Sequence, residues 1–344
     1  MADRAGVARD RELAGKVVII DGLTGNGKTM VAPIVGSLDR LELMRFNYHL
    51  ENIVELAHMG AVSNDVVASL IRTWTDIDLY RSIIGRESNF RYRDLSGAFH
   101  NSQVLKYLRR LIGPGDEEAM GMIERQRPIL LLVTHMIAVG FHHLHAALGE
   151  RLCFIELVRH PLYLIKQTRT YMPHFERDPR VFHQLFNRGE RQLQWWTWGW
   201  EDLYLRSNPM DQAIYMINWY FRWMDENLTR FDDVAQERLM LLPFERFVLD
   251  PEPYMTALES FIGTTAGTRT ARELRKQNVP RGMYAEGIAL KIYKRFGWEM
   301  PDRGASEDDE LAKRRAFAAD EATEEAMKCL DQLCRDYERL YLAS

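Results

Sequence analysis

A glycine-rich stretch near the start of the chain places the strongest limit on its fold. Residues 22–29 read Gly-Leu-Thr-Gly-Asn-Gly-Lys-Thr and fit the pattern G-x-x-x-x-G-K-S/T in full. The β-branched run Val17–Ile20 comes directly before this stretch, and residues 30–35 can continue after it as a helix. This order of strand, loop and helix is the context in which backbone N–H groups surround phosphate oxygens. The sequence therefore predicts a phosphate-binding loop between a strand and a helix.

Each residue type in this loop suits that chemistry. Glycines let the backbone curl so that successive N–H groups point at phosphate oxygens. Lys28 would neutralise phosphate charge, and Thr29 could hold a Mg²⁺ ion or donate a hydrogen bond to phosphate. The residues predicted to bind the phosphorylated donor are Gly22, Thr24, Gly25, Asn26, Gly27, Lys28 and Thr29. The alternative is a strand-to-helix turn that binds no ligand.

Composition excludes several classes of protein. The chain has 46% hydrophobic and 27% charged residues, as expected of a soluble globular protein, and its net charge of −4 gives no general basic field for nucleic acid. The three cysteines have no metal-ligand spacing and form no even disulfide set, which suits a reducing cytoplasm, and no metal site is expected. The longest apolar run, residues 129–141, is too short to span a bilayer, so the sequence predicts no transmembrane segment and leaves peripheral membrane contact open.

Short apolar runs alternate with helical patterns along the chain. Strands are expected at residues 16–21, 41–46, 128–134, 152–158 and 238–242, and helices at 53–74, 103–112, 141–149, 162–170, 213–231, 251–262 and 311–342. This alternation predicts an α/β fold, a three-layer sandwich around a mostly parallel sheet. We expect a flexible leader over residues 1–14, one phosphate-loop domain over 15–300, and an acidic linker and C-terminal helix over 301–344 that pack on the same domain.

One segment stands apart from this alternation. Residues 172–210 are expected to be irregular, and they contain the tryptophan-rich run Trp195–Trp200. We interpret that run as core packing or an oligomer contact, with an aromatic acceptor pocket or a membrane contact as the alternatives.

Four short segments occur in an order that points to a family. An apolar strand ends in Thr134-His135, and another ends in Val158-Arg159-His160-Pro161. The run Leu242-Pro-Phe-Glu-Arg-Phe-Val-Leu-Asp-Pro251 then leads into a helix, and the chain closes with Leu333-Cys-Arg-Asp-Tyr-Glu-Arg-Leu-Tyr341. This order resembles the sulfotransferase family. The resemblance implies transfer of a sulfuryl group from the sulfate donor PAPS to a hydroxyl or amine of a small-molecule or glycan acceptor.

The resemblance also implies roles for individual residues. His135 matches the histidine that acts as general base toward the acceptor, a task that suits a neutral imidazole. Lys28 would stabilise the charge that grows on the leaving nucleotide. The alternative for His135 is a structural histidine at the end of a strand.

Further residues match positions that bind the 3′-phosphate of the donor. Arg159 matches an arginine whose planar fork suits bidentate phosphate contact, and its alternative is a surface ion pair. The family has a serine eight residues later, where this chain has Gln167, so the neighbouring Thr168 is the expected replacement. Arg281-Gly282 is the candidate for a later Arg-Gly pair, with Arg275-Lys276 as the fallback.

The loop itself departs from the family pattern and opens a second hypothesis. Sulfotransferases commonly have Pro-Lys-Ser-Gly-Thr-Thr where this chain has residues 24–29, with lysine at the Walker position. An ATP- and Mg²⁺-dependent small-molecule kinase is therefore the alternative, with Asp21 or Glu156 assisting the metal and arginines between 169 and 191 forming a lid. The strand ending at Thr134 supplies no acid for the metal, which favours sulfate transfer. A non-enzymatic phosphate-loop binder is the third reading.

Overall fold

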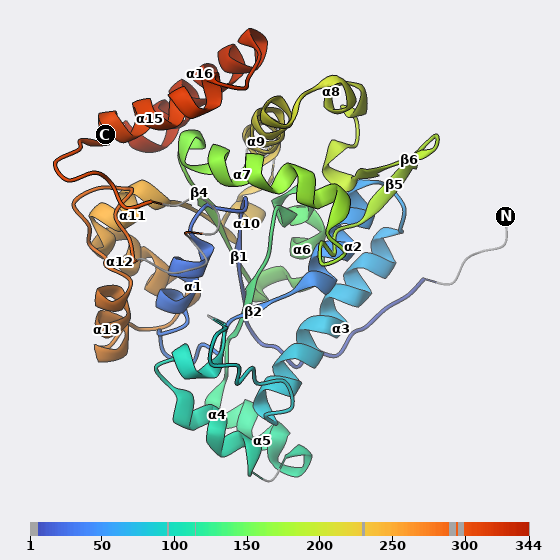
Figure 1. Cartoon of the computed structure of the whole chain (residues 1–344). Helices are drawn as coiled ribbons and strands as arrows, with labels where there is room; N and C mark the ends of the chain where they lie inside the picture. The colour runs from blue at the N-terminus through green and yellow to red at the C-terminus, as the bar shows by residue number, and fades with distance from the viewer. Residues whose placement is uncertain are drawn as a thin grey trace, which may run out of the picture.

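A five-stranded parallel sheet lies at the centre of the molecule (Figure 1). The computed structural model describes residues 6–94, 96–113, 115–228, 231–288, 294 and 299–343. The strands, in their order across the sheet, are β2 (Arg45–Phe46), β3 (Leu130–Val133), β1 (Val17–Asp21), β4 (Leu152–Val158) and β7 (Leu239–Pro243). All neighbours in this sheet pair in parallel, so the prediction of a mostly parallel sheet is confirmed.

Helices cover both faces of the sheet, which confirms the three-layer arrangement. One face carries α2 (Tyr48–His58), α3 (Asn64–Ile83), α6 (Phe141–Leu148), α7 (Pro161–Arg177), α9 (Pro209–Leu228) and α16 (Glu324–Tyr337). The other carries α1 (Lys28–Val35), α11 (Phe244–Leu249), α12 (Pro251–Ile262) and α13 (Thr268–Lys276). Alternate residues of β1 face the two cores: Val17 and Ile19 pack with the first group, and Val18 with the second. This burial on both faces is why the strand is continuously apolar.

The remaining elements lie around these layers. They are α4 (Val104–Leu111), α5 (Asp116–Gln126), α8 (Glu201–Arg206), α10 (Asp233–Gln236), α15 (Glu307–Ala319) and the antiparallel hairpin of β5 (Leu185–Arg188) and β6 (Arg191–Gln194). Short 3-10 helices are η1 (Ala98–His100), η2 (Ile137–Gly140), η3 (Gly149–Arg151) and η4 (Trp195–Thr197), and η5 (Glu338–Leu342) is a π-helical turn. Within the described residues, none of the helices is both long and apolar enough to cross a membrane.

Several predicted element boundaries were wrong. The helix expected over residues 53–74 is two helices, because Gly60 ends α2 with a φ of 68° and α3 starts afresh at Asn64. The helix expected over 311–342 is also two, because the Thr323 hydroxyl caps the start of α16 at the Ala326 N–H. Of the strand expected over 41–46, the last two residues pair in the sheet, and Leu41 forms an isolated bridge to Ile129.

The segment expected to be irregular is largely regular. Helix α7 continues to Arg177, and the hairpin β5–β6 follows before η4. Trp195 and Trp196 are buried at 0% and 1% exposure, whereas Trp198 remains 44% exposed. The first two rings therefore belong to the core, which is the interpretation that the sequence favoured.

The two ends of the chain pack on the same sheet domain. Residues 6–14, expected to be a flexible leader, run along α3: Arg9 pairs with Asp76 at 2.6 Å, and the N–H groups of Leu13 and Ala14 donate to the same carboxylate. Residues 1–5 of that leader lie outside the described residues. At the other end, α15 begins inside the expected linker at Glu307 and packs on α7, while α16 packs on α7 and α9.

Candidate active site

The glycine-rich loop, residues 22–27, connects β1 to α1 at the carboxyl edge of the sheet. Gly27 has a φ of 103° and immediately precedes the first residue of α1, Lys28. A Cβ atom on Gly27 would overlap the ring of Phe244, and one on Gly22, whose φ is 126°, would overlap the Asn26 side chain. Both the backbone conformation and the close packing therefore require glycine here.

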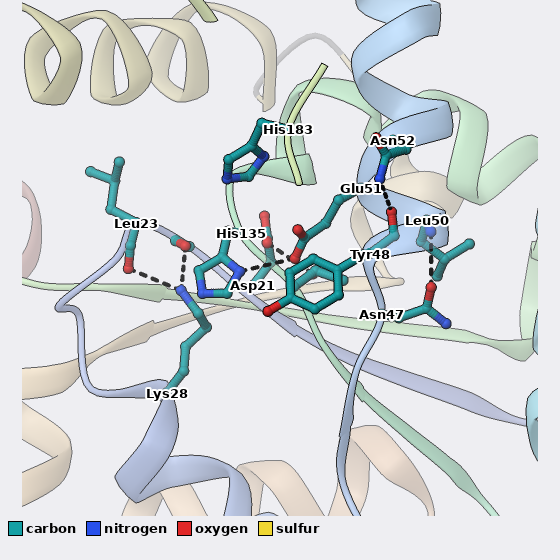
Figure 2. A network of polar contacts seen from close by, with 12 residues as sticks. Asp21, Leu23, Lys28, Asn47, Tyr48, Leu50, Glu51, Asn52, His135 and His183 are labelled. Atoms are coloured by element: carbon teal, nitrogen blue, oxygen red, sulfur yellow. Dashed lines mark hydrogen bonds and ion pairs between the residues drawn. The ribbon is translucent and has the colours of Figure 1, made fainter. Parts of the chain in front are cut away.

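Lys28 is folded back into this loop. It is 5% exposed, and its ammonium donates to the carbonyls of Gly22 and Leu23, the latter at 2.9 Å (Figure 2). Burial lowers the pKa of Lys28 to about 8, against the opposing charges of Asp21 and Glu156. The lysine thus carries its charge at neutral pH, and its ammonium donates to uncharged oxygens of the loop.

A cavity of about 240 Å³ opens beside the loop. Residues 24–30 form one wall, α7 contributes another, and Phe244, Arg281 and residues 285–287 close it further. The described lining is strongly cationic, with Lys28, Arg159, Lys166, Arg281 and Arg314 as basic residues and Glu286 as the acidic one. A ligand of this cavity would have to carry several negative charges.

His135 lines the same cavity from the end of β3. Its Nδ1 lies 2.9 Å from Oε1 of Glu51 (Figure 2). Its ring stacks on Phe46 with the centroids 5.9 Å apart. Burial holds the pKa of His135 well below 6.5, and the charge of Lys28 adds to this effect. The imidazole is therefore neutral at pH 7, with Nε2 as the nitrogen left for a ligand in the cavity.

Glu51 was missed by the sequence analysis. It lies on α2 at 1% exposure, and burial raises its pKa to about 8, with the nearby carboxyl of Glu55 acting in the same direction. A glutamate on the buried face of an amphipathic helix, where an apolar residue is expected, was the signal that could have found it.

Asp21 and Glu156 do not line the cavity. Asp21 accepts hydrogen bonds from the Thr134 hydroxyl at 2.9 Å and the Ala138 N–H at 2.8 Å, so it fixes both ends of the turn that carries His135. Glu156 accepts from the Tyr220 hydroxyl at 3.0 Å, and burial raises its pKa well above 4.5. The metal-assisting role considered for these two acids has no support in the structure. Within the described residues no group of three His, Cys, Asp or Glu side chains could hold a metal ion.

Arg159 follows β4 at the same edge of the sheet as His135, and it also lines the cavity. Its Nη1 donates to the Gly25 carbonyl at 2.8 Å, and its guanidinium lies over the rings of Phe244 and Tyr163, at 4.3 and 4.9 Å from their centroids. Its Nε is buried and has no hydrogen-bond partner in the described structure. Arg281 reaches the same cavity, with its guanidinium 5.7 Å from the Phe244 centroid.

One predicted contact residue, Thr168, lies outside the cavity. The Thr168 hydroxyl is buried and donates to the Leu164 carbonyl of its own helix, whereas Gln167 lines the cavity beside Gly25. The expected replacement of the family's serine by Thr168 is therefore wrong in its geometry, because consecutive helical residues point about 100° apart.

Of the pair Arg281-Gly282, only the arginine lines the cavity. Arg281 lines the cavity, but the Gly282 N–H donates to Glu286 and Gly282 is not part of the lining. The fallback Lys276 pairs with Glu273 at 3.3 Å, away from the cavity. The described lining also contains no arginine from residues 169–191, so the expected lid is not seen there.

Comparisons with known proteins find likeness in structure. No family model matches the chain, and no curated protein matches it. The chain is similar to the sulfotransferase domain of the Synechococcus PCC 7002 olefin synthase, at 14% identity over 97% of this chain and 98% of that one, with a TM-score of 0.42. A sulfotransferase domain from the curacin biosynthetic pathway gives 14% identity over 94% and 98%, with a TM-score of 0.42. A mouse sulfotransferase in complex with PAP gives 11% identity over 98% and 88%, with a TM-score of 0.38.

Proposed function

We propose that the chain is a sulfotransferase that moves a sulfuryl group from PAPS to a hydroxyl or amine of a small-molecule or glycan acceptor. One observation carries the proposal. A single cavity brings together a lysine at a helix N-terminus, several arginines and a neutral histidine. Transfer of a sulfuryl group needs positioning and charge stabilisation and requires no nucleophile from the protein. These side chains supply both.

The donor would lie along the cationic side of the cavity. The N-terminus of α1, Lys28 and Thr29 would hold the phosphosulfate end, where negative charge grows on the oxygen that bridges phosphorus and sulfur. Lys28 would exchange the carbonyls of Gly22 and Leu23 for this stronger anionic partner. Arg159, whose buried Nε has no hydrogen-bond partner among the described residues, would contact the second phosphate.

The acceptor would enter beside His135. Nε2 of this histidine would take the proton from the acceptor hydroxyl or amine as the group attacks sulfur. The Glu51 carboxylate would accept the Nδ1–H and thereby keep the lone pair on Nε2. Phe46 and Tyr171 line the cavity as well and give the acceptor an aromatic surface to pack on.

An ATP-dependent kinase remains the second candidate because Lys28 and Thr29 match a nucleotide triphosphate loop. Such an enzyme needs a carboxylate that reaches Mg²⁺ beside Thr29. Asp21, which ends β1 just before the loop, accepts hydrogen bonds from Thr134 and Ala138. Glu286, the acidic residue of the described lining, accepts from the N–H groups of Gly282 and Met283. These contacts favour sulfate transfer.

The test follows consumption of PAPS in a mixture of phenols, alcohols and amino sugars. We expect the wild-type chain to form PAP, and His135→Gln to reduce turnover by about 100-fold or more because the base is lost. His135→Gln should still bind adenosine 3′,5′-bisphosphate within about threefold of wild type. The control is His174→Gln, on the exposed side of α7, which should behave as wild type. Wild-type turnover in His135→Gln would exclude the base role, and transfer from ATP in place of PAPS would make the chain a kinase.

A further inference from the structure

The C-terminal helix α15 contributes a cation to the cavity. Arg314 lines the cavity, and its side chain is 15% exposed. The guanidinium carbon lies 4.1 Å from the centroid of the Tyr163 ring, and Nη2 makes a long contact of 3.4 Å to Glu310. Its Nε is buried and has no hydrogen-bond partner in the described structure. This guanidinium is therefore held in place by stacking and by one long ion pair to the buried Glu310 carboxylate, and its Nε is left for a ligand.

Arg314 shares the Tyr163 ring with Arg159. Both guanidinium carbons lie within 5 Å of the ring centroid, at 4.1 and 4.9 Å, and both Nε atoms are buried without a partner in the described structure. Burial lowers the pKa of Arg159, the Glu245 carboxylate opposes this effect, and the positive charge of Arg314 is close enough to add to the lowering. Two like charges held together are unfavourable until an anion binds between them. Planar guanidinium groups with free N–H donors suit a phosphate dianion.

The position of Arg314 is fixed by contacts between α15 and the rest of the cavity wall. The Glu307 carboxylate at the start of α15 accepts hydrogen bonds from the Tyr163 hydroxyl and, at 2.8 Å, from the Tyr284 N–H. Near the other end of the helix, Arg169 of α7 donates to Glu321 at 2.8 Å. These contacts hold α15 against α7 and direct Arg314 to the ring that Arg159 also covers.

We propose that Arg159 and Arg314, gathered on the Tyr163 ring, form one anion subsite for a phosphomonoester, separate from the phosphosulfate end that Lys28 holds. This inference rests on the proposed function and extends it, because a residue of the C-terminal helix α15 completes the donor site. In the donor proposed above, the 3′-phosphate is the group that occupies the subsite.

The test compares two nucleotides that differ by one phosphate. Calorimetric titration uses adenosine 3′,5′-bisphosphate and adenosine 5′-monophosphate with the wild type, Arg314→Gln and Arg315→Gln. The neighbouring Arg315 pairs with Asp331 at 2.7 Å and does not line the cavity, so it is the matched control. Loss of a charge-assisted contact should weaken binding of the bisphosphate to Arg314→Gln by about 10- to 100-fold. Binding of the monophosphate should change by less than about threefold, and Arg315→Gln should match wild type for both.

Each other outcome has a separate meaning. If the wild type binds the bisphosphate and Arg314→Gln binds it equally well, the subsite is refuted and the proposed function stands. An equal loss for both nucleotides would also refute the assignment, because Arg314 would then not distinguish the extra phosphate. If the wild type does not bind the bisphosphate, the proposed function fails, and the subsite with it. Arg314→Lys keeps the charge without the planar fork and should recover part of the affinity for the bisphosphate. Such recovery would show that the loss in Arg314→Gln does not come from a folding defect.

Discussion

At the scale of single residues, the His135–Glu51 pair determines when a base is available. Burial keeps the imidazole neutral and raises the pKa of Glu51 to about 8. Below that pH the Glu51 carboxyl keeps its proton and donates it in a hydrogen bond to Nδ1 of His135. The proton of the neutral imidazole then lies on Nε2, which cannot act as a base. Above that pH, the carboxylate accepts the Nδ1–H and leaves the lone pair on Nε2. The form of the pair that can remove a proton from an acceptor is thus the alkaline one.

This gives a prediction for the pH dependence of the reaction. Turnover at saturating PAPS should rise as the pH passes about 8, because Glu51 must lose its proton and its pKa in the folded protein is about 8. Glu51→Gln, which keeps the shape of the side chain and cannot titrate, should remove this rise and lower turnover by about 10- to 100-fold. The measurement is turnover from about pH 6 to about pH 9 for both proteins. An unchanged pH profile in Glu51→Gln would show that another group titrates.

At the scale of the elements, the turn between β3 and η2 connects the base to the donor loop. Asp21, the last residue of β1, accepts hydrogen bonds from Thr134 and Ala138, which flank His135. The residue after Asp21 begins the glycine-rich loop. The position of His135 relative to the loop is therefore set by one buried carboxylate.

Thr134→Val tests this connection. The change keeps the volume of the side chain but removes the donor to buried Asp21, so the protein should lose about 1 to 3 kcal/mol of unfolding free energy. Turnover should fall by about tenfold while binding of adenosine 3′,5′-bisphosphate stays within about threefold, because the turn moves and the donor loop does not. Urea unfolding, turnover and calorimetry measure the three quantities. Thr134→Ser keeps the hydroxyl and serves as the control; equal loss of turnover in both variants would contradict the account.

The glycine-rich loop and the strand before it were predicted correctly from the sequence. The loop, its lysine and the strand that precedes it lie within one short stretch, so spacing alone located them. The breaks at Gly60 and Thr323 were missed because apolar positions continue at helical spacing through both of them. Thr168 was chosen over Gln167 because a hydroxyl resembled the family's serine, but the helix directs Gln167 to the cavity.

At the scale of the whole molecule, the cavity is assembled from segments far apart in the sequence. Glu51 comes from α2 and Arg314 from α15, and neither carries a local motif that marks it. The last long helix also reaches the site: the Tyr337 hydroxyl of α16 donates to Glu245 at 2.5 Å, and Glu245 accepts from the N–H of His160, the residue after Arg159. Such contacts depend on how the layers pack, which the spacing of residues along the chain does not reveal.

We expect this assembled cavity to bind a nucleotide with two separate phosphate groups without a metal ion. The most direct measurement is calorimetric titration of the wild type with adenosine 3′,5′-bisphosphate in the presence of a chelator, and with ATP plus Mg²⁺. We expect metal-independent binding of the bisphosphate, and about 30-fold or greater weakening in Lys28→Ala, because the lysine is the buried cation of the loop. Binding of ATP only with Mg²⁺, and no binding of the bisphosphate, would contradict the account and assign the cavity to a kinase.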